Sequence, residues 1–289
     1  MSDQTPGSAS SARAGMLRTG SAAIVRGIEA CGESVAVRVR FLGGLAYLFG
    51  DACLWSLRGL FQPRVKFGRQ ALAYQMVRVG VRSIPIIILV EMFVGVILAL
   101  QLAPTLQDYG QIERIADVVA IAIFRELGPL ISAIVLSGFA GASIAAEIGA
   151  MNEAEELKAL RAHALNPIHY LVVPRIWATV FMLTGLCVIA DVVGAFGGLI
   201  TAWGVLGISP TVYIEYTQQA IEIRDFVTGL VKAGVFGLLI SLIACYEGMN
   251  VSGGAEGVGL ATTATVVKSI VALIGTDVLF TAVFFAFGL

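Results

Sequence analysis

An arginine and a glutamate stand side by side inside an otherwise apolar stretch of the sequence. Arg125 and Glu126 precede Leu127, Gly128 and Pro129. Charged groups inside a long apolar segment are costly unless they face a partner or a water-filled cavity. Pro129 removes a backbone donor and should kink or begin a helix. Two interpretations stay open: a local ion pair that holds the kink, or side chains that line a substrate cavity.

Other ionisable residues also interrupt apolar runs: Glu91, Glu147, Asp191, Lys232, Lys268 and Asp277. A proton or ion relay is one possible use of such a set. The simpler expectation is that they pair within a helical bundle, lie near helix ends or snorkel. Carboxylates are candidate partners for Lys232 and Lys268, but the sequence does not say which ones.

Motifs for nucleotide, metal or covalent chemistry are missing. The stretch Gly253–Gly259 has no G-K-[ST] ending and follows no apolar strand, so we expect a flexible turn. His163 and His169 lack further residues at metal-ligand spacing. No G-x-S-x-G occurs, and nothing pairs a nucleophile with a base. We therefore expect no catalytic set, metal or cofactor in this chain. Buried, inert thiols are expected at Cys31, Cys53, Cys187 and Cys245.

The composition of the chain indicates the kind of protein in which these residues lie. Of 289 residues, 57% are hydrophobic and 13% charged, and the mean hydropathy is +0.87. Soluble domains carry about 45–50% apolar and about 25% charged residues. The composition argues against a soluble enzyme and a disordered chain and predicts an all-α, polytopic membrane protein.

Five segments reach the roughly 20 apolar residues that a membrane span requires. They are residues 84–103, closed by Pro104, and residues 118–151, 176–206, 226–246 and 266–289. Residues 41–83 are expected to form an interfacial amphipathic region, with a sixth span as the alternative. Residues 1–40 are expected to be a disordered cytoplasmic tail. Residues 84–289 then form the membrane domain.

Positive charge sets the expected orientation. Before the first span lie Arg64, Lys66, Arg69, Arg78 and Arg82, whereas the loops on the other side carry mostly carboxylates. The positive-inside rule predicts a cytoplasmic N-terminus and a C-terminus on the far side.

Small residues recur every four positions along the second span. One stripe is Gly138, Ala142, Ala146 and Ala150, and a neighbouring stripe is Gly141, Ala145 and Gly149. Small residues at this spacing let helices approach closely in lipid. Packing within one bundle and packing between subunits remain equal alternatives.

The segment 152–166 predicts a short charged helix between the second and third spans. Asn152 is the expected N-cap, with Glu153, Glu155 and Glu156 in the first turn and Pro167 as the stop. Such an amphipathic helix is either a surface element or a docking element for a partner.

Several motifs occur in one order and together resemble a known family. They are R-E-L-G-P at Arg125–Pro129, A-E-I-G at Ala146–Gly149, N-P at Asn166–Pro167 and P-R-x-W-A at Pro174–Ala178. A second block comprises Lys232, Gly257, Ala261–Thr263, Val266–Val267 and Asp277. Over about residues 65–289 the chain resembles the MlaE/YrbE permeases, the membrane subunits of lipid-transporting ABC systems that work with MCE proteins.

The resemblance implies a homodimeric permease with an interfacial helix and five spans per subunit. It implies a separate cytoplasmic ATPase dimer that holds ATP and Mg²⁺, and a ring of MCE subunits on the far side. Phospholipid or a related lipid would be the substrate, and nucleic acid is not an expected partner. The expected location is the bacterial inner membrane, with the C-terminus periplasmic.

The resemblance also implies roles for particular residues. The lipid cavity would be lined by Leu98, Gln101, Leu102, Thr105, Leu106, Tyr109, Arg125 and Glu126. Contact with the ATPase would come from Glu153, Glu155, Glu156, Leu157, Leu160 and Arg161. The spacing of the small residues, rather than the resemblance, makes the candidates for helix packing Gly138, Gly141, Ala142, Ala145, Ala146 and Gly149. An ATP-independent lipid carrier or scramblase and a membrane enzyme that acts on lipids remain the alternatives.

Overall fold

The computed structural model describes residues 32, 36, 39–58 and 69–287. The chain forms two compact units, residues 1–47 and residues 48–289, and each is considered by itself. In the first unit the described residues are helical. The predicted tail, residues 1–40, lies outside the described residues except for 32, 36, 39 and 40, as do Arg64 and Lys66.

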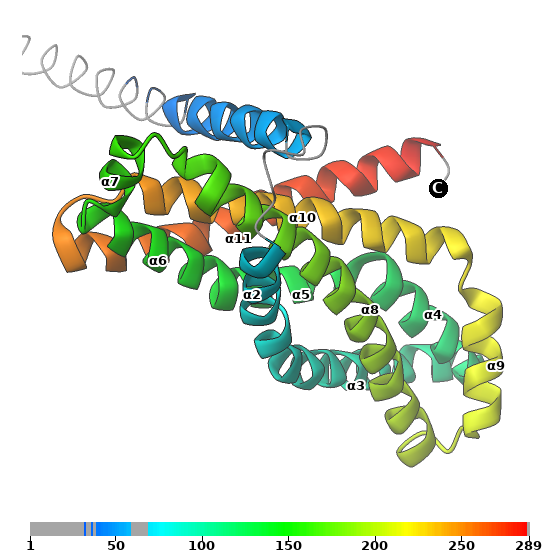
Figure 1. The fold of residues 1–289 in the computed structure, drawn as a ribbon. Coiled ribbons are helices and arrows are strands. Elements are labelled where there is room, and N and C mark those ends of the chain that lie inside the picture. Colours follow the sequence, from blue (N-terminus) through cyan, green and yellow to red (C-terminus); the bar gives the residue numbers. More distant parts are fainter. Residues whose placement is uncertain (1–31, 33–35, 37–38, 59–68, 288–289) are drawn as a thin grey trace, which may run out of the picture. The chain divides into compact units, whose positions relative to one another are not determined.

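The second unit is built from helices, and its described residues include no strand (Figure 1). Residues 48–58 are helical. The first half of the remaining chain contains α2 (Arg69–Val79), η1 (Val81–Ser83), α3 (Ile84–Asp108), η2 (Ile112–Arg114), α4 (Ile115–Ala122), η3 (Ile123–Leu127), α5 (Gly128–Leu136), η4 (Ser137–Gly141) and α6 (Ala142–Glu153). The second half contains α7 (Glu156–Ala162), η5 (Ile168–Val172), α8 (Val173–Gly204), α9 (Pro210–Ala220), α10 (Ile223–Met249) and α11 (Gly254–Phe287).

Five helical stretches are long and apolar enough to cross a membrane, as predicted. They are Gln70–Asp108, Ile112–Glu153, Ile168–Gly204, Ile223–Met249 and Gly254–Phe287. Figure 1 places α7 and α9 at opposite ends of this set of helices.

Two predicted helix boundaries are wrong. Pro104 does not end the first span, because α3 continues to Asp108. The proline costs one backbone hydrogen bond, and the last turn still packs Leu106 against a buried cluster. The predicted turn at 253–259 is confined to its start, since α11 begins at Gly254. Ala255 and Glu256 favour helix, and a carboxylate in the first turn complements the helix dipole.

Helix irregularities precede two of the prolines. The π-helical turn η3 ends just before Pro129, which stands in the first turn of α5. A second π turn, η5, ends just before Pro174 in the first turn of α8. A proline ring clashes with the carbonyl four residues earlier, and a wider π turn relieves that clash. The predicted irregularity at Pro129 is confirmed.

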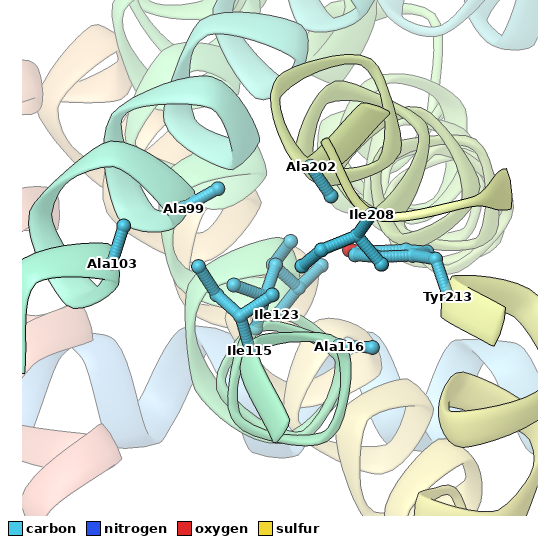
Figure 2. Close-up of a cluster of buried hydrophobic side chains, with 9 residues drawn as sticks. Ala99, Ala103, Ile115, Ala116, Ile123, Ala202, Ile208 and Tyr213 are labelled. Carbon is cyan, nitrogen blue, oxygen red and sulfur yellow. The ribbon is translucent and has the colours of Figure 1, made fainter. Parts of the chain in front are cut away.

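A cluster of buried side chains joins α3, α4, α8 and α9 (Figure 2). Its members are Ala99, Ala103, Ile115, Ala116, Val119, Ile123, Ala202, Ile208 and Tyr213. We did not predict α9, although Ser209 and Pro210 carry a helix-start signal. The Ser209 hydroxyl caps α9 by accepting from the Val212 amide at 3.3 Å. Tyr213 on α9 is buried, which raises its pKa to about 12.

Candidate functional site

Arg125 and Glu126 project from η3 toward α10, where each pairs with a different residue and not with the other. Arg125 Nε donates to Asp225 Oδ1 on α10 at 2.5 Å. Glu126 Oε2 accepts from Lys232 Nζ, also on α10, at 2.6 Å. The interpretation as a local ion pair is therefore wrong, because both groups bind a helix about 100 residues further along the chain.

Lys232 is the centre of this polar cluster. Its side chain is 1% exposed, and its ammonium lies 2.9 Å from Asp277 Oδ1 on α11 as well as beside Glu126. The Thr281 hydroxyl, one turn after Asp277, donates to Glu126 Oε1 at 3.1 Å. A buried ammonium with two carboxylates is stable where an isolated one would not be. The cluster thus ties η3, α10 and α11 together.

Asp225 serves two purposes, and sequence reasoning missed it. Its Oδ2 accepts from the Glu222 amide at 3.0 Å and so caps the start of α10. Its Oδ1 binds Arg125. A carboxylate three residues into a helix is a recognisable capping signal. Its ion pair with Arg125, however, depends on the position of η3 in the folded chain, which the sequence around Asp225 does not indicate.

A cavity of about 160 Å³ opens beside the cluster. Its lining residues are Arg125, Glu126, Thr228, Thr281, Phe284 and Phe285. The side chains of Arg125 and Glu126 are 43% and 37% exposed. Arg125 uses Nε for Asp225, so its terminal nitrogens have no protein partner among the described residues. The site can present a guanidinium to an anion while phenylalanine rings contact an apolar chain.

The residues expected at the cavity from α3 and its C-cap, Tyr109, fall into two groups, one packed within the chain and one exposed. Leu98, Leu102 and Leu106 pack against the buried cluster of α3, α4, α8 and α9. Gln101, Thr105 and Tyr109 are exposed. Within this single chain, the described lining of the cavity at Arg125 includes no α3 residue.

The two stripes of small residues differ in burial. A Cβ added at Gly149 would lie 2.8 Å from Val251 Cγ2, and one at Gly141 would lie 3.2 Å from Ile240 Cγ2 on α10. Ala145, between these glycines, is fully buried. On the other stripe Gly138 and Ala150 are exposed, and Ala142 and Ala146 are half-buried. The stripe of Gly141, Ala145 and Gly149 therefore packs within the chain, and the stripe that begins at Gly138 faces outward.

The predicted helix over 152–166 is shorter than expected. Asn152 and Glu153 belong to the last turn of α6, so the predicted N-cap at Asn152 is wrong. Asn152 Nδ2 donates to the Val251 carbonyl at 3.0 Å, and Glu153 Oε2 accepts from the Gly254 amide at 2.8 Å. These bonds connect the end of α6 to the turn between α10 and α11.

The helix α7 begins only after Glu155, whose positive φ of 60° separates it from α6. Leu157 is buried and Leu160 is half-buried. Glu156 and Arg161 are exposed. Lys158 donates to Glu155 at 2.6 Å, which lowers the pKa of that carboxyl. A charged face is therefore available to a partner.

Most of the other predicted intramembrane charges are paired. Lys268 binds Glu247 at 2.7 Å, and Glu147 pairs with Arg78 and Arg175. Glu91 and Asp191 differ, because they are buried and no cation pairs with either among the described residues. The same part of the chain has no group of three or more residues that could hold a metal ion.

Comparison of the sequence with known proteins finds a matching family model and several similar permeases. The family model described as "Permease MlaE" matches residues 72–283. A "Probable ABC transporter permease protein" of Rickettsia felis is 39% identical over 211 residues, which are 73% of this chain and 82% of that protein. The "Intermembrane phospholipid transport system permease protein MlaE" of Haemophilus influenzae is 30% identical over 266 residues, 92% of this chain and 100% of that protein. The chloroplastic protein TRIGALACTOSYLDIACYLGLYCEROL 1 of Arabidopsis thaliana is 35% identical over 211 residues, 73% of this chain and 60% of that protein.

Proposed function

The chain belongs to the MlaE permease family, and from this premise we propose that it is the membrane subunit of an ABC transporter that moves phospholipid between membranes. Two copies would form the permease, and a separate cytoplasmic ATPase dimer would bind ATP and Mg²⁺. An MCE protein on the far side would exchange lipid with the permease. A diacyl lipid buries many CH₂ groups, each worth about 0.8 kcal/mol, so its extraction from a bilayer requires an energy source.

The observation that carries this proposal is the half-exposed Arg125 beside Phe284 and Phe285 in one cavity. A guanidinium binds a phosphodiester through paired hydrogen bonds. Aromatic rings next to it offer an apolar surface for the first part of an acyl chain. Charged groups within a membrane span are costly, which favours a role for this cluster beyond packing.

A second copy would enlarge the cavity. Gln101, Thr105 and Tyr109 are exposed in one chain and would complete a shared lipid-binding space at the dimer interface. Leu98, Leu102 and Leu106 would hold α3 in place from behind, since they pack on the buried cluster. The outward stripe of Gly138, Ala142 and Ala146 would permit close approach of another helix.

The helix α7 would dock on the ATPase. An exposed charged face comes from Glu153, Glu155, Glu156 and Arg161, and the leucines Leu157 and Leu160 lie beneath it. Movement of α7 would reach the turn between α10 and α11 through the bonds from Asn152 and Glu153. Those two helices carry Lys232 and Asp277, the partners that hold η3.

The proposed location is the bacterial inner membrane, with α7 and the N-terminus in the cytoplasm and α9 and the C-terminus in the periplasm. The positive-inside rule supports this orientation. Labelling of single cysteines introduced at Lys158 and Gln219, both exposed, tests it. An impermeant maleimide should label intact spheroplasts only at position 219.

Affinity purification from native membranes tests the assembly. We expect an ATPase, an MCE protein and bound phospholipid to be recovered with the chain. Recovery without any nucleotide-binding partner would instead favour an ATP-independent carrier. In proteoliposomes that contain the complete assembly, Arg125→Gln should lower ATP-driven lipid transfer at least about tenfold through loss of a charge-assisted hydrogen bond. Normal transfer by an intact Arg125→Gln complex would contradict the assigned lipid site.

A further inference from the structure

A second, smaller pocket lies away from Arg125, where α2 meets α6. Its volume is about 120 Å³, and its lining residues are Gln75, Arg78, Val79, Arg82, Phe139, Ala140, Ser143 and Ile144. None of these residues lines the cavity beside Lys232.

The pocket has more positive than negative charge. Arg78 and Arg175 share one carboxylate, that of Glu147. Arg82 lines the pocket, is exposed and has no carboxylate partner among the described residues. The lining therefore holds two guanidiniums and no carboxylate, and Arg78 shares its only carboxylate partner among the described residues with Arg175. The pocket thus offers positive charge to an anion.

Hydrogen-bonding groups in the pocket are also unsatisfied. Gln75 is 8% exposed, yet its Oε1 has no hydrogen-bond partner in the part of the chain that the structure describes. Buried polar atoms in folded proteins are nearly always bonded, so an orphaned acceptor points to a missing donor. Ser143 Oγ accepts from Arg78 Nη2 at 2.7 Å, which leaves its own hydroxyl hydrogen available to the pocket.

The pocket lies beside the start of the membrane-spanning helix α3. The helix α3 has 25 residues, and at about 1.5 Å per residue it can cross the roughly 30 Å hydrocarbon core alone. Arg78 and Arg82 precede it and so fall at the boundary of that core. Phe139 in the lining is 44% exposed, and it offers an apolar surface to the rest of an amphiphile.

We propose that this pocket binds the phosphodiester headgroup of a phospholipid from the adjoining leaflet. Arg82 and Arg78 bind the phosphate, and Gln75 accepts a hydrogen bond from the headgroup. Ethanolamine supplies such a donor, whereas choline does not. The pocket therefore prefers phosphatidylethanolamine to phosphatidylcholine. This inference requires neither an ATPase nor transport, so it can be tested, and refuted, independently of the proposed function.

Native mass spectrometry of the purified chain, titrated with either lipid at matched chain length, tests the proposal. The chain carries Arg125→Gln throughout, so that the other cavity contributes little. Adding Arg82→Gln should weaken phosphatidylethanolamine binding about tenfold, the loss expected for one charge-assisted hydrogen bond. Arg114→Gln, which removes another exposed cation, one that pairs with Asp117, should leave binding unchanged. Equal losses in both variants, or none in Arg82→Gln, would overturn the site.

Two further measurements separate the lipid from other anions and test the role of Gln75. Inorganic phosphate at millimolar concentration should not displace the lipid, and displacement would show a site for free phosphate instead. Gln75→Leu should abolish the preference for phosphatidylethanolamine while retaining the binding of phosphatidylcholine. An unchanged preference would refute the acceptor role of Gln75.

Discussion

Lys232 Nζ lies 2.6 Å from Glu126 Oε2, although 106 residues separate them in the sequence. The same ammonium is 2.9 Å from Asp277 Oδ1. One fully buried cation thus joins three of the membrane-spanning stretches, at a place where a half-exposed glutamate faces a cavity. Stability and the proposed lipid contact therefore involve the same residues.

Removal of this ammonium should destabilise the chain. Lys232→Met leaves Asp277 without a partner inside the bundle, and breaking a buried pair costs about 3–5 kcal/mol. We expect the low end of that range because Glu126 is 37% exposed. The melting temperature in detergent, followed by fluorescence-detected gel filtration, measures the loss. Addition of Asp277→Asn should restore part of it, and a double variant less stable than Lys232→Met would argue against the pair.

A methyl group at Gly128 should conflict with Asp191. An added Cβ would collide with Asp191 Oδ1, and overpacking of this kind costs about 1–3 kcal/mol. Gly128→Ala should therefore lower the melting temperature, and Asp191→Ala in the same chain should reduce the loss. Gly185→Ala on α8 is the matched control, because its Cβ would meet no atom of the described residues within 4 Å. If the losses caused by Gly128→Ala and Asp191→Ala were simply additive, the two sites would be independent and the predicted conflict would be absent.

The two small-residue stripes should respond differently to leucine. Gly149→Leu would collide with Val251 and should reduce the yield of folded chain. Gly138→Leu lies on the exposed stripe and should leave the fold intact while weakening the proposed dimer. Light scattering coupled to gel filtration distinguishes these outcomes. A Gly138→Leu chain that remains dimeric would exclude this stripe from the subunit interface.

Charge reversal on α7 should disrupt docking of the proposed ATPase. Glu156→Lys together with Arg161→Glu changes exposed side chains, so the fold should persist. Co-purification of the ATPase should fall at least about tenfold if two charged contacts are lost. Glu215→Lys on α9, at the opposite end of the helices (Figure 1), serves as the control. Undiminished recovery of the ATPase by the α7 variant would reject the coupling assignment.

Tyr213 should titrate late. Burial raises its pKa to about 12, above the usual value of about 10 for tyrosine. Between these values the unfolded chain loses the proton first, so stability falls as pH rises from about 10 to about 12 and is unaffected below about 10. Absorbance at alkaline pH should show one late tyrosinate that disappears in Tyr213→Phe. An unchanged titration curve would contradict the burial of this hydroxyl.

Hydropathy and local motifs were sufficient to predict the membrane class, the five spans and the irregularity at Pro129. These properties depend on the average polarity of about 20 neighbouring residues or on one proline, and both are visible along the chain. Ordered motifs such as R-E-L-G-P were also enough to indicate the family. Local signals failed at Asn152, because the residue types that cap a helix can also bond across to another element, here Val251.

Only the tertiary structure decided which charges meet and which helix faces are inside. Glu126 pairs with Lys232 rather than with adjacent Arg125, and Gly141 packs on α10 whereas Gly138 faces outward. These outcomes depend on the rotation of each helix about its axis and on its register against helices far away in the sequence. A rotation of one residue, about 100°, moves a side chain to another face without changing the hydropathy of the span. Sequence polarity therefore determined the spans, and packing between helices determined the site.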